Sequence, residues 1–268
     1  MIRVPSAPRH SLLWASRMAE WRILRGWSKG EIADRLERIA SRPLNFSGVY
    51  EEMTPENGWN RYHSEAVIAK EPPGPPLPEG PFRRAEVAVA NYHLSDPAVV
   101  VGHFDAESRL LGRRMLLEMK AMGLHYLASV VVGAVRFEED DRCHTFGFRY
   151  DTLDGHIERG SEWFLLTKDT CSGEIRFRIE AAWVPGQFPN WWSRLGFRYL
   201  GPRYQKRWHH EAHWRLFRIA HRGMTATPGV DELGVAHAGP TVLFERTPRH
   251  PSVPRPRWEE EEETITSS

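Results

Sequence analysis

Apolar and polar side chains alternate along several stretches in the second half of the chain. The pattern is clearest over residues 174–184, where every second side chain is apolar and most of the others are charged. Such alternation is typical of a strand that buries one face and exposes the other to water. The same pattern predicts further strands over residues 125–137, 144–153 and 162–168. Their short connections, rich in Asp and Gly, suit antiparallel hairpins, so we expect an antiparallel sheet covered on a single side.

The segment before these strands shows both kinds of periodicity. Residues 84–94 alternate as a strand does, and residues 98–104 form a second, more buried strand candidate. Residues 106–122 are predicted as a helix, because four apolar residues fall on one helical stripe. Asp105 can cap the start of this helix and Gly123 can end it.

A long helix is predicted from Pro202 to about His221, because proline is favoured in the first helical turn. One side of this helix is a stripe of Arg and Glu residues. The opposite side carries His209, Ala212, His213, Leu216 and Ala220. We expect this apolar side to cover the dry face of the sheet.

The remaining segments set the expected domain boundaries. Two short helices are predicted near the N-terminus, the second with Ser28 and Glu31 in a capping-box arrangement. Irregular structure is expected from Pro43 to Lys70, and a short strand over residues 241–246. The predicted division is an N-terminal part of helices and irregular extension (1–69), a proline-rich linker (70–81), a sheet-and-helix domain (82–223) and an irregular, largely disordered acidic tail (224–268).

Composition narrows the possible partners. The formal net charge is +1, so no global field recruits nucleic acid, and we expect no nucleic-acid role. No apolar run approaches the roughly 20 residues that span a bilayer, so no transmembrane segment is predicted. The 2 cysteines without a CxxC motif favour a reducing, cytoplasmic location. The 11 tryptophans indicate large buried rings or contact with an amphipathic ligand, and the oligomeric state stays open.

Residues 146–164 carry a recognisable motif. They read FGFRYDTLDGHIERGSEWF: an aromatic-Gly-aromatic strand, a Thr-Leu-x-Gly-His turn, and a strand with Glu158, Gly160, Glu162 and Phe164 at alternate positions. This motif resembles that of an uncharacterised family titled domain of unknown function nineteen-ninety. That family is related to the START-like and pollen-allergen-like helix-grip superfamily.

The resemblance is close over residues 144–220 and looser over residues 82–136. It implies an α+β, helix-grip (START-like) fold, in which a curved antiparallel sheet wraps around a long C-terminal helix and encloses a cavity. The extra N-terminal helices fall outside the match. Ser161 stands where a second acid is common in the family, which argues against a mechanism built on that carboxylate pair. Because the family has no settled activity, the resemblance implies a fold and not a reaction.

The hairpin in this motif offers the first candidate site. Asp154 and Gly155 form a turn pair, and His156 and Glu158 next to it could simply cap the backbone. On the functional interpretation His156 is a proton-transfer group at a cavity mouth, and Glu158 or Glu162 sets its pKa. Glu162 shares a strand face with apolar residues. It would therefore need a buried partner, for which Arg149 and a tyrosine hydroxyl are the candidates.

The helix histidines offer the second candidate site. His209 and His213, one helical turn apart, could bind a metal, line a cavity or pack in the core. No third ligand is evident, so no metal is expected. No cofactor is expected either, because no G-x-G-x-x-G follows a strand and no Walker loop occurs.

The leading hypothesis is the binding of a hydrophobic or amphipathic small molecule, such as a lipid, isoprenoid or polyketide-like compound, between the sheet and the long helix. The expected ligand-binding residues are Phe146, Phe148, Arg149, Phe177, Ile179, Trp183 and Leu216. One alternative is a cyclase- or dehydratase-type enzyme in the same cavity. Its candidate catalytic residues are His156, Glu162, Tyr150, His209 and His213. The other alternative is a protein-interaction module that uses the Arg- and Trp-rich surface and the acidic tail.

Overall fold

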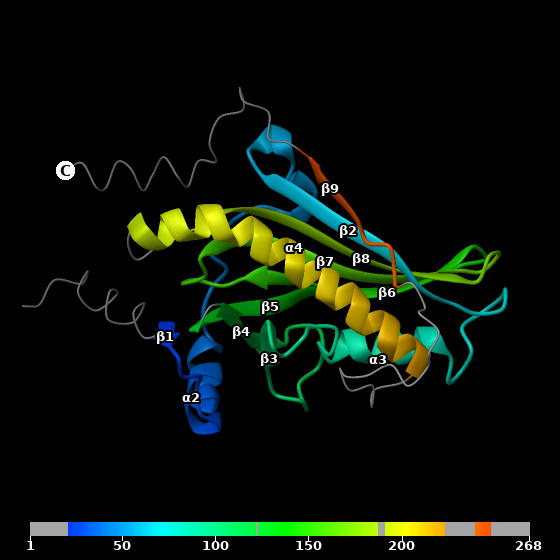
Figure 1. Cartoon of the computed structure of the whole chain (residues 1–268), viewed down its shortest axis with the longest axis horizontal. Coiled ribbons are helices and arrows are strands. Elements are labelled where there is room, and N and C mark those ends of the chain that lie inside the picture. Colours follow the sequence, from blue (N-terminus) through cyan, green and yellow to red (C-terminus); the bar gives the residue numbers. More distant parts are fainter. Residues whose placement is uncertain (1–20, 122, 187–190, 223–238, 248–268) are drawn as a thin grey trace, which may run out of the picture.

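The computed structural model describes residues 21–121, 123–186, 191–222 and 239–247 (Figure 1). Within these residues the chain forms a 9-stranded sheet in the order β3-β4-β5-β6-β7-β8-β2-β9, with β1 paired to β5. All its strand pairs are antiparallel. The strands are β1 (Trp21–Ile23), β2 (Asn60–Lys70), β3 (Val100–His103), β4 (Arg114–Ala121), β5 (Leu124–Glu139), β6 (Cys143–Thr152), β7 (Glu158–Asp169), β8 (Glu174–Pro185) and β9 (Leu243–Thr247).

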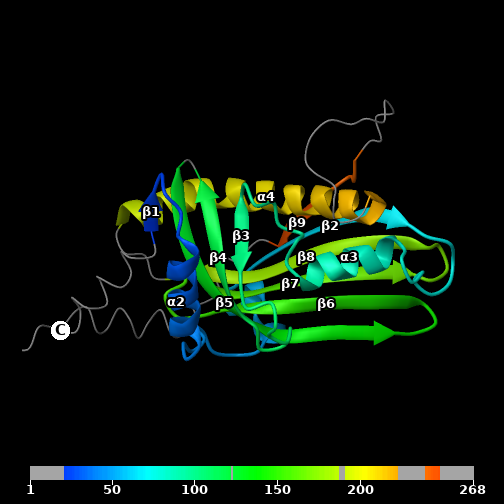
Figure 2. The same ribbon diagram turned by 90° about the horizontal axis from the view of Figure 1, so that it is seen from below.

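The helices are α2 (Lys29–Ile39), α3 (Pro81–Ala90) and α4 (Trp191–Arg222), with 3-10 turns η1 (Tyr50–Glu52) and η2 (Pro55–Asn57). Both α3 and α4 lie on one face of the sheet, and α4 runs obliquely across the strands (Figures 1 and 2). Arg84 Nε of α3 donates a hydrogen bond to the Ala220 carbonyl near the end of α4, at 3.0 Å. The guanidinium therefore satisfies one of the carbonyls that a helix end leaves unpaired.

The half of this interface next to α3 is a packed core. Phe148, Phe164 and Phe177 on β6, β7 and β8 are each no more than 1% exposed. The rings of Phe148 and Phe164 lie 5.0 Å apart between centroids. Leu216 and Ala212 of α4 belong to the same apolar cluster. The predicted covering of the apolar sheet face by the long helix is thus confirmed, as is the α+β helix-grip fold.

The opposite face of the sheet is covered by the segment that precedes β2. Ile32 and Ile39 of α2 pack against the sheet around Leu127. Further along this segment, Trp59 packs against Val184 of β8. The expectation of a sheet covered on a single side is therefore wrong, because the apolar residues that interrupt the charged face at the end of β8 are buried under this segment.

Much of the predicted secondary structure is confirmed. The strand predictions over residues 98–104, 125–137, 144–153, 162–168 and 174–184 correspond to β3, β5, β6, β7 and β8. Helix α2 begins with the predicted capping box, in which Ser28 Oγ accepts from Glu31 N–H and the Glu31 side chain accepts from Ser28 N–H. The short strand near residue 243 is β9. The first N-terminal helix and the acidic tail fall mainly on residues 1–20 and 248–268, outside the described residues. The end of that predicted helix is wrong, because residues 21–23 form β1.

The prediction of a strand over residues 84–94 is wrong. These residues belong to α3 and the turns after it. Pro81 occupies the first turn of the helix, where its missing N–H costs nothing. Phe82, Ala85 and Val89 are buried at helical spacing. The alternation of valine and alanine in the sequence hid this periodicity, since alanine is small enough for either face.

The prediction of a helix over residues 106–122 is also wrong, because Arg114–Ala121 is strand β4. Met115 and Met119 are four residues apart, a spacing that fits one helical turn and two strand repeats equally well. Both lie on the core side of β4. β4 pairs with β5 along its whole length, and this pairing selects the strand over the helix.

Two further boundaries differ from the predictions. Residues 60–70, expected to be irregular, form β2, which pairs with β8. The long helix begins at Trp191 and not at Pro202. The sheet therefore draws the strand between β8 and β9 from the segment that the sequence assigned to the extension.

Candidate functional site

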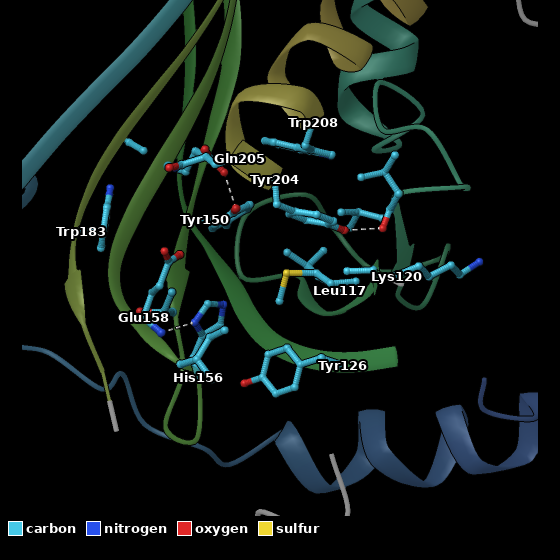
Figure 3. Close-up of a pocket in the computed structure, with 18 of the residues that line it drawn as sticks. Leu117, Lys120, Tyr126, Tyr150, His156, Glu158, Trp183, Tyr204, Gln205 and Trp208 are labelled. Carbon is cyan, nitrogen blue, oxygen red and sulfur yellow. Dashed lines mark hydrogen bonds between the residues drawn. The ribbon is translucent and has the colours of Figure 1, made fainter. Parts of the chain in front are cut away.

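A cavity of about 880 Å³ lies where α4, at residues 203–208, crosses the ends of the strands (Figure 3). Most of its surface is apolar. Val99, Leu117, Met119 and Ile157 supply aliphatic walls. Rings of tyrosine and tryptophan supply much of the rest, and they come from six separate segments: Trp21, Tyr92, Tyr126, Tyr150, Trp183, Tyr204 and Trp208.

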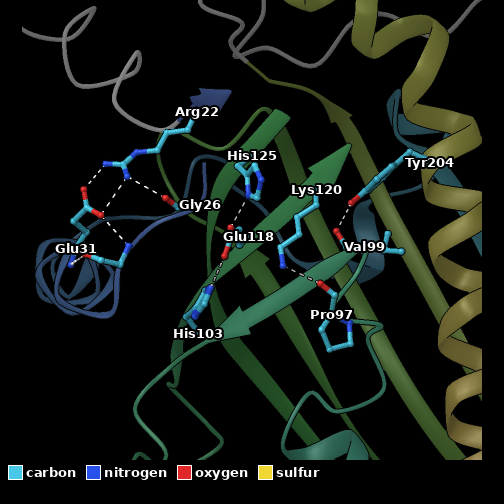
Figure 4. Close-up of polar contacts among 11 residues, drawn as sticks. Arg22, Gly26, Glu31, Pro97, Val99, His103, Glu118, Lys120, His125 and Tyr204 are labelled. Atoms are coloured by element: carbon cyan, nitrogen blue, oxygen red, sulfur yellow. Dashed lines mark hydrogen bonds and ion pairs between the residues drawn. The ribbon is translucent and has the colours of Figure 1, made fainter. Parts of the chain in front are cut away.

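Hydrogen bonds hold α4 against the loop before β3 on one side of this cavity. Tyr204 O–H donates to the Val99 carbonyl at 2.6 Å (Figures 3 and 4). Trp208 Nε1–H donates to Ser95 Oγ at 2.9 Å. Lys120 on β4 donates from Nζ to the Pro97 carbonyl at 3.0 Å (Figure 4). Buried tyrosine and tryptophan commonly pair their polar atom in this way, and the rings are thereby fixed in the wall.

A short polar chain runs from the cavity into the core. The Tyr150 hydroxyl lines the cavity and donates to Glu162 Oε2. The other carboxylate oxygen of Glu162 lies 3.3 Å from His209 Nε2 on α4. Glu162 is 6% exposed and His209 is fully buried. The partner that Glu162 needs is therefore a tyrosine hydroxyl and an imidazole, and not Arg149.

Ser64 on β2 continues the chain. Its Oγ lies 2.7 Å from His209 Nδ1 and 2.9 Å from His213 Nε2. A serine hydroxyl has one proton, so it can donate to only one of the two rings. If His209 donates from Nε2 to Glu162, its Nδ1 accepts from Ser64, and Ser64 accepts from His213 Nε2–H. Every hydrogen bond of this polar chain is then donated in the direction of Glu162.

His156 and Glu158 form the floor of the cavity beside this chain (Figure 3). Glu158 N–H donates to His156 Nδ1 at 2.9 Å. The backbone here is well fixed, since Asn45 Nδ2 donates to the Glu158 carbonyl at 2.9 Å and His156 N–H donates to the Leu153 carbonyl at 3.1 Å. The turn before it has Gly155 at φ 85°, a conformation that glycine adopts without strain.

Burial sets the charge of these groups. It lowers the pKa of His156 to about 4, and that of His213, beside His209, to about 3. Burial and the charge of Glu162 together raise the pKa of Glu158 to about 8. The same two causes raise the pKa of the Tyr150 hydroxyl well above its usual range. At neutral pH the cavity floor therefore holds a neutral imidazole and a largely protonated carboxyl group.

The structure separates the predicted site residues into three groups. Tyr150, His156, Glu162 and Trp183 line the cavity. His209 and His213 are buried behind it and reach it through Glu162. The remaining residues do not line the cavity: Phe146, Phe148, Phe177, Ile179 and Leu216 pack in the core, and Arg149 is paired with Asp151. The site proposed below leaves this third group out.

Several cavity residues were missed by sequence reasoning. Leu117 and Met119 were assigned to a helix, and Val99 and Tyr92 come from the loop that precedes β3. Tyr204 and Trp208 stand one turn apart on α4, a spacing that the helical wheel could have revealed. Among the described residues, no three His, Cys, Asp or Glu side chains gather so as to hold a metal ion.

A second polar cluster lies on the opposite side of β4, away from the cavity. Glu118 accepts from His103 Nε2 at 3.0 Å and from His125 Nδ1 at 2.8 Å (Figure 4). Next to it, Arg22 on β1 is paired with Glu31 on α2. These contacts tie β3, β4 and β5 together and attach the N-terminal segment, which is a structural role.

The antiparallel sheet and the long helix that crosses it define a helix-grip protein. The chain belongs to the family named Domain of unknown function (DUF1990), whose profile matches residues 45–215. No curated protein matches the chain. No helix within the described part of the chain combines the length and apolar character needed to cross a membrane.

Solved structures give distant similarities. Ara h 8.0201 is 12% identical with a TM-score of 0.35, over 59% of this chain and 99% of that one. Human STARD10 is 9% identical with a TM-score of 0.34, over 74% and 82% of the two chains. The hypothetical protein jhp0584 from Helicobacter pylori is 10% identical with a TM-score of 0.40, over 66% and 98%. At these values they add no argument about function.

Proposed function

We propose that this protein binds a hydrophobic or amphipathic small molecule in the cavity beneath α4. The single observation that carries the proposal is the cavity itself, about 880 Å³ with mainly apolar walls and several polar side chains, among them His156, Glu158 and Glu162. Ligand pockets of roughly 300–1,000 Å³ with this distribution of polar groups are typical of small-molecule sites. A lipid, an isoprenoid or a polyketide-like compound has the matching chemistry.

The fixed walls support the same proposal. The Tyr204 and Trp208 rings are held by hydrogen bonds to the loop before β3 and cannot collapse into the cavity without breaking them. A preformed apolar cavity gives affinity without the cost of ordering its side chains on binding. The apolar body of the ligand would lie against Leu117 and Met119, and its polar end would face His156 and Glu158.

The test is binding to the intact protein and to a variant with an obstructed cavity. Native mass spectrometry of the purified protein would detect a retained molecule, and a thermal-shift screen with lipids and isoprenoids would detect added ones. Met119→Trp should fill part of the cavity and lower or abolish the shift, whereas Val87→Trp should not, because Val87 is 52% exposed on α3. Equal shifts for both variants, or no retained molecule and no shift at all, would contradict the proposal.

The polar chain favours a second candidate function, acid–base catalysis of the cyclase or dehydratase type. Tyr150 and Glu162 reach the cavity, and His209 stands behind Glu162 at 3.3 Å. The Glu162 carboxylate, with the His209 imidazole beside it, could take up a proton from a bound molecule. In an enzyme, Glu162→Gln should abolish turnover of the bound molecule and leave its affinity nearly unchanged. Equal losses of affinity and turnover would indicate a binding protein and not an enzyme.

A further inference from the structure

The cavity floor presents one N–H group that has no partner. His156 is 7% exposed, and its Nδ1 accepts from Glu158 N–H at 2.9 Å. A ring nitrogen that accepts is unprotonated, so the proton of the neutral imidazole is on Nε2. Among the described residues no hydrogen bond to Nε2 occurs, and His156 lines the cavity (Figure 3). The N–H group faces the cavity and is therefore open to an acceptor atom of a ligand bound there.

Glu158 stands next to this donor and also lacks a partner. Its side chain extends into the cavity between Trp183 and His156 (Figure 3). Within the described part of the chain, no hydrogen bond or ion pair reaches its carboxyl group, although both backbone groups of Glu158 are bonded. The carboxyl group is therefore the second polar group of the floor that is open to a ligand.

Glu162, the other carboxyl group of the cavity, is in a different state. Tyr150 donates to one of its oxygens and His209 lies 3.3 Å from the other. In contrast to Glu158, Glu162 therefore has a protein neighbour at each of its two oxygens. Its negative charge in turn disfavours a second charge on Glu158, in line with the pKa of about 8 for Glu158.

We propose that His156 and Glu158 act as a pair of neutral hydrogen-bond donors that binds an oxygen acceptor, a ketone or ester carbonyl, on an otherwise apolar ligand. This inference rests on the proposed function, because it specifies the ligand of the same cavity. The imidazole donates from Nε2 and the carboxylic acid from its O–H. Both donors lie at the floor, so the oxygen binds deep in the cavity and the apolar body lies toward Leu117 and Met119.

The other charged groups of the cavity favour a neutral ligand over a cation. Arg203 and Arg207 of α4 and Lys120 of β4 line the same space, and they would repel an ammonium group that enters it. The remaining titratable side chains that face the floor are the hydroxyls of Tyr92, Tyr126, Tyr150 and Tyr204. Burial raises the pKa of Tyr92 and Tyr150 well above the usual range and that of Tyr204 to about 12, so these three hydroxyls stay neutral at physiological pH.

The proposal predicts a distinctive dependence on pH. Near neutral pH Glu158 carries its proton and can donate to a carbonyl. As the pH rises through about 8 the group ionises, so affinity for a ketone should fall toward tenfold per pH unit. An ammonium ligand would behave in the opposite way, because it would bind the ionised form and gain affinity over the same range.

The experiment measures displacement of the dye anilinonaphthalene sulfonate from the whole protein by undecanone and by undecylamine, from about pH 6 to 9. We expect the ketone to bind more tightly than the amine and to weaken above about pH 8. Glu158→Gln retains a donor and loses the titration, so it should bind the ketone nearly as wild type does and without the pH dependence. Glu158→Ala should weaken ketone binding about tenfold, the value of one good hydrogen bond.

The control variant is Glu79→Gln, which changes an exposed glutamate outside the cavity and should leave both ligands unaffected. Tighter binding of the amine, or loss of ketone binding in Glu158→Gln, would contradict the inference about the donor pair but not the proposed function. Equal affinity for ketone and amine at every pH would overturn it as well. Failure of the dye, the ketone and the amine to bind at all would overturn the proposed function together with this inference.

Discussion

His209 Nε2 on α4 lies 3.3 Å from Glu162 Oε1 on β7, inside the apolar interface between the long helix and the sheet. Ser64 on β2 adds hydrogen bonds to His209 Nδ1 and His213 Nε2, so buried polar contacts help to position α4 on the sheet. Apolar side chains tolerate small slides of one layer over another, whereas a hydrogen bond holds only over a narrow range of distance. The rest of the interface on β7, such as Phe164, then packs around a fixed point.

We expect Ser64→Ala to destabilise the fold. Ser64 Oγ is the partner of both His209 Nδ1 and His213 Nε2, and the variant leaves two buried ring nitrogens unsatisfied. Each costs about 1–3 kcal/mol, so the free energy of unfolding should fall by several kcal/mol in urea denaturation. Ser41→Ala, at an exposed serine, is the matched control and should change it by less than about 0.5 kcal/mol. A loss no larger than that of the control would show that the hydroxyl is not the bridge.

Glu71 and Lys168 form a second buried polar contact, and removing one of the two partners should strongly destabilise the fold. Lys168 Nζ donates to Glu71 Oε2 at 2.8 Å and to the Pro75 carbonyl at 3.0 Å, which attaches the proline-rich loop to β7. Lys168→Met leaves a buried carboxylate without its cation and should cost about 3–5 kcal/mol of unfolding free energy. The double variant Lys168→Met with Glu71→Gln should recover part of that loss in the same denaturation assay. No recovery would mean that the lysine acts through packing.

The buried histidines should make the fold sensitive to mild acid. The pKa of His156 falls to about 4 and that of His213 to about 3 in the folded protein, below the ordinary value of 6.5. Both are neutral when folded and take up a proton on unfolding. Their contribution is therefore fully present above about pH 6.5 and is lost as the pH falls toward 4. The expected slope is up to about 1.4 kcal/mol per pH unit for each histidine.

Denaturation from about pH 7 to 5 checks this dependence. His213→Gln should remove one histidine's share of the slope and keep an amide that can reach Ser64. His221→Gln is the control, because His221 is exposed on the same helix and should leave the slope unchanged. Identical slopes in wild type and His213→Gln would contradict the assignment of a neutral buried His213.

Gly160 should tolerate no side chain. Its φ is 151°, and a Cβ atom there would lie 2.0 Å from the Ala182 carbonyl oxygen on β8. Gly160→Ala must therefore separate β7 from β8 at the wall of the cavity, and we expect a loss of at least about 1–3 kcal/mol in thermal or urea unfolding. Gly30→Ala is the opposite case, since nothing lies within 4 Å and the residue is helical. It should stabilise the protein by about 0.5–1 kcal/mol. A neutral Gly160→Ala would show that the two strands are not held this closely.

The sequence predicted the parts of the fold in which one periodicity is unambiguous. In β8, Ile175, Phe177 and Ile179 alternate with charged residues, and this fits no helical face. In β4 the Met115–Met119 spacing fits both structures, and only pairing with β5 selects the strand. Such long-range pairing leaves no pattern in the local sequence, and strand β2 could not be predicted for the same reason.

The candidate site was predictable only in part, for a related reason. The turn motif identified His156, and strand parity placed Glu162 on the apolar face of its strand. Parity cannot say which part of that face is covered tightly and which is left open. Phe148 and Phe177 share the face and are packed. The opening depends on where α4 crosses the strands, which is set by contacts such as that of Tyr204 with Val99.

The place of β2 in the sheet has a consequence for biosynthesis. Strands β5 to β8 each pair with their neighbour in the sequence, whereas Asn60 on β2 bonds to Trp183, 123 residues away. A nascent chain can assemble the meander as it leaves the ribosome, but β2 is made first and must stay unpaired until β8 has emerged. Closure of this distant pair should be a late and slow event, because contacts between remote segments slow folding. Until then β2 is an unprotected edge, the kind of surface that chaperones cover and that aggregation exploits.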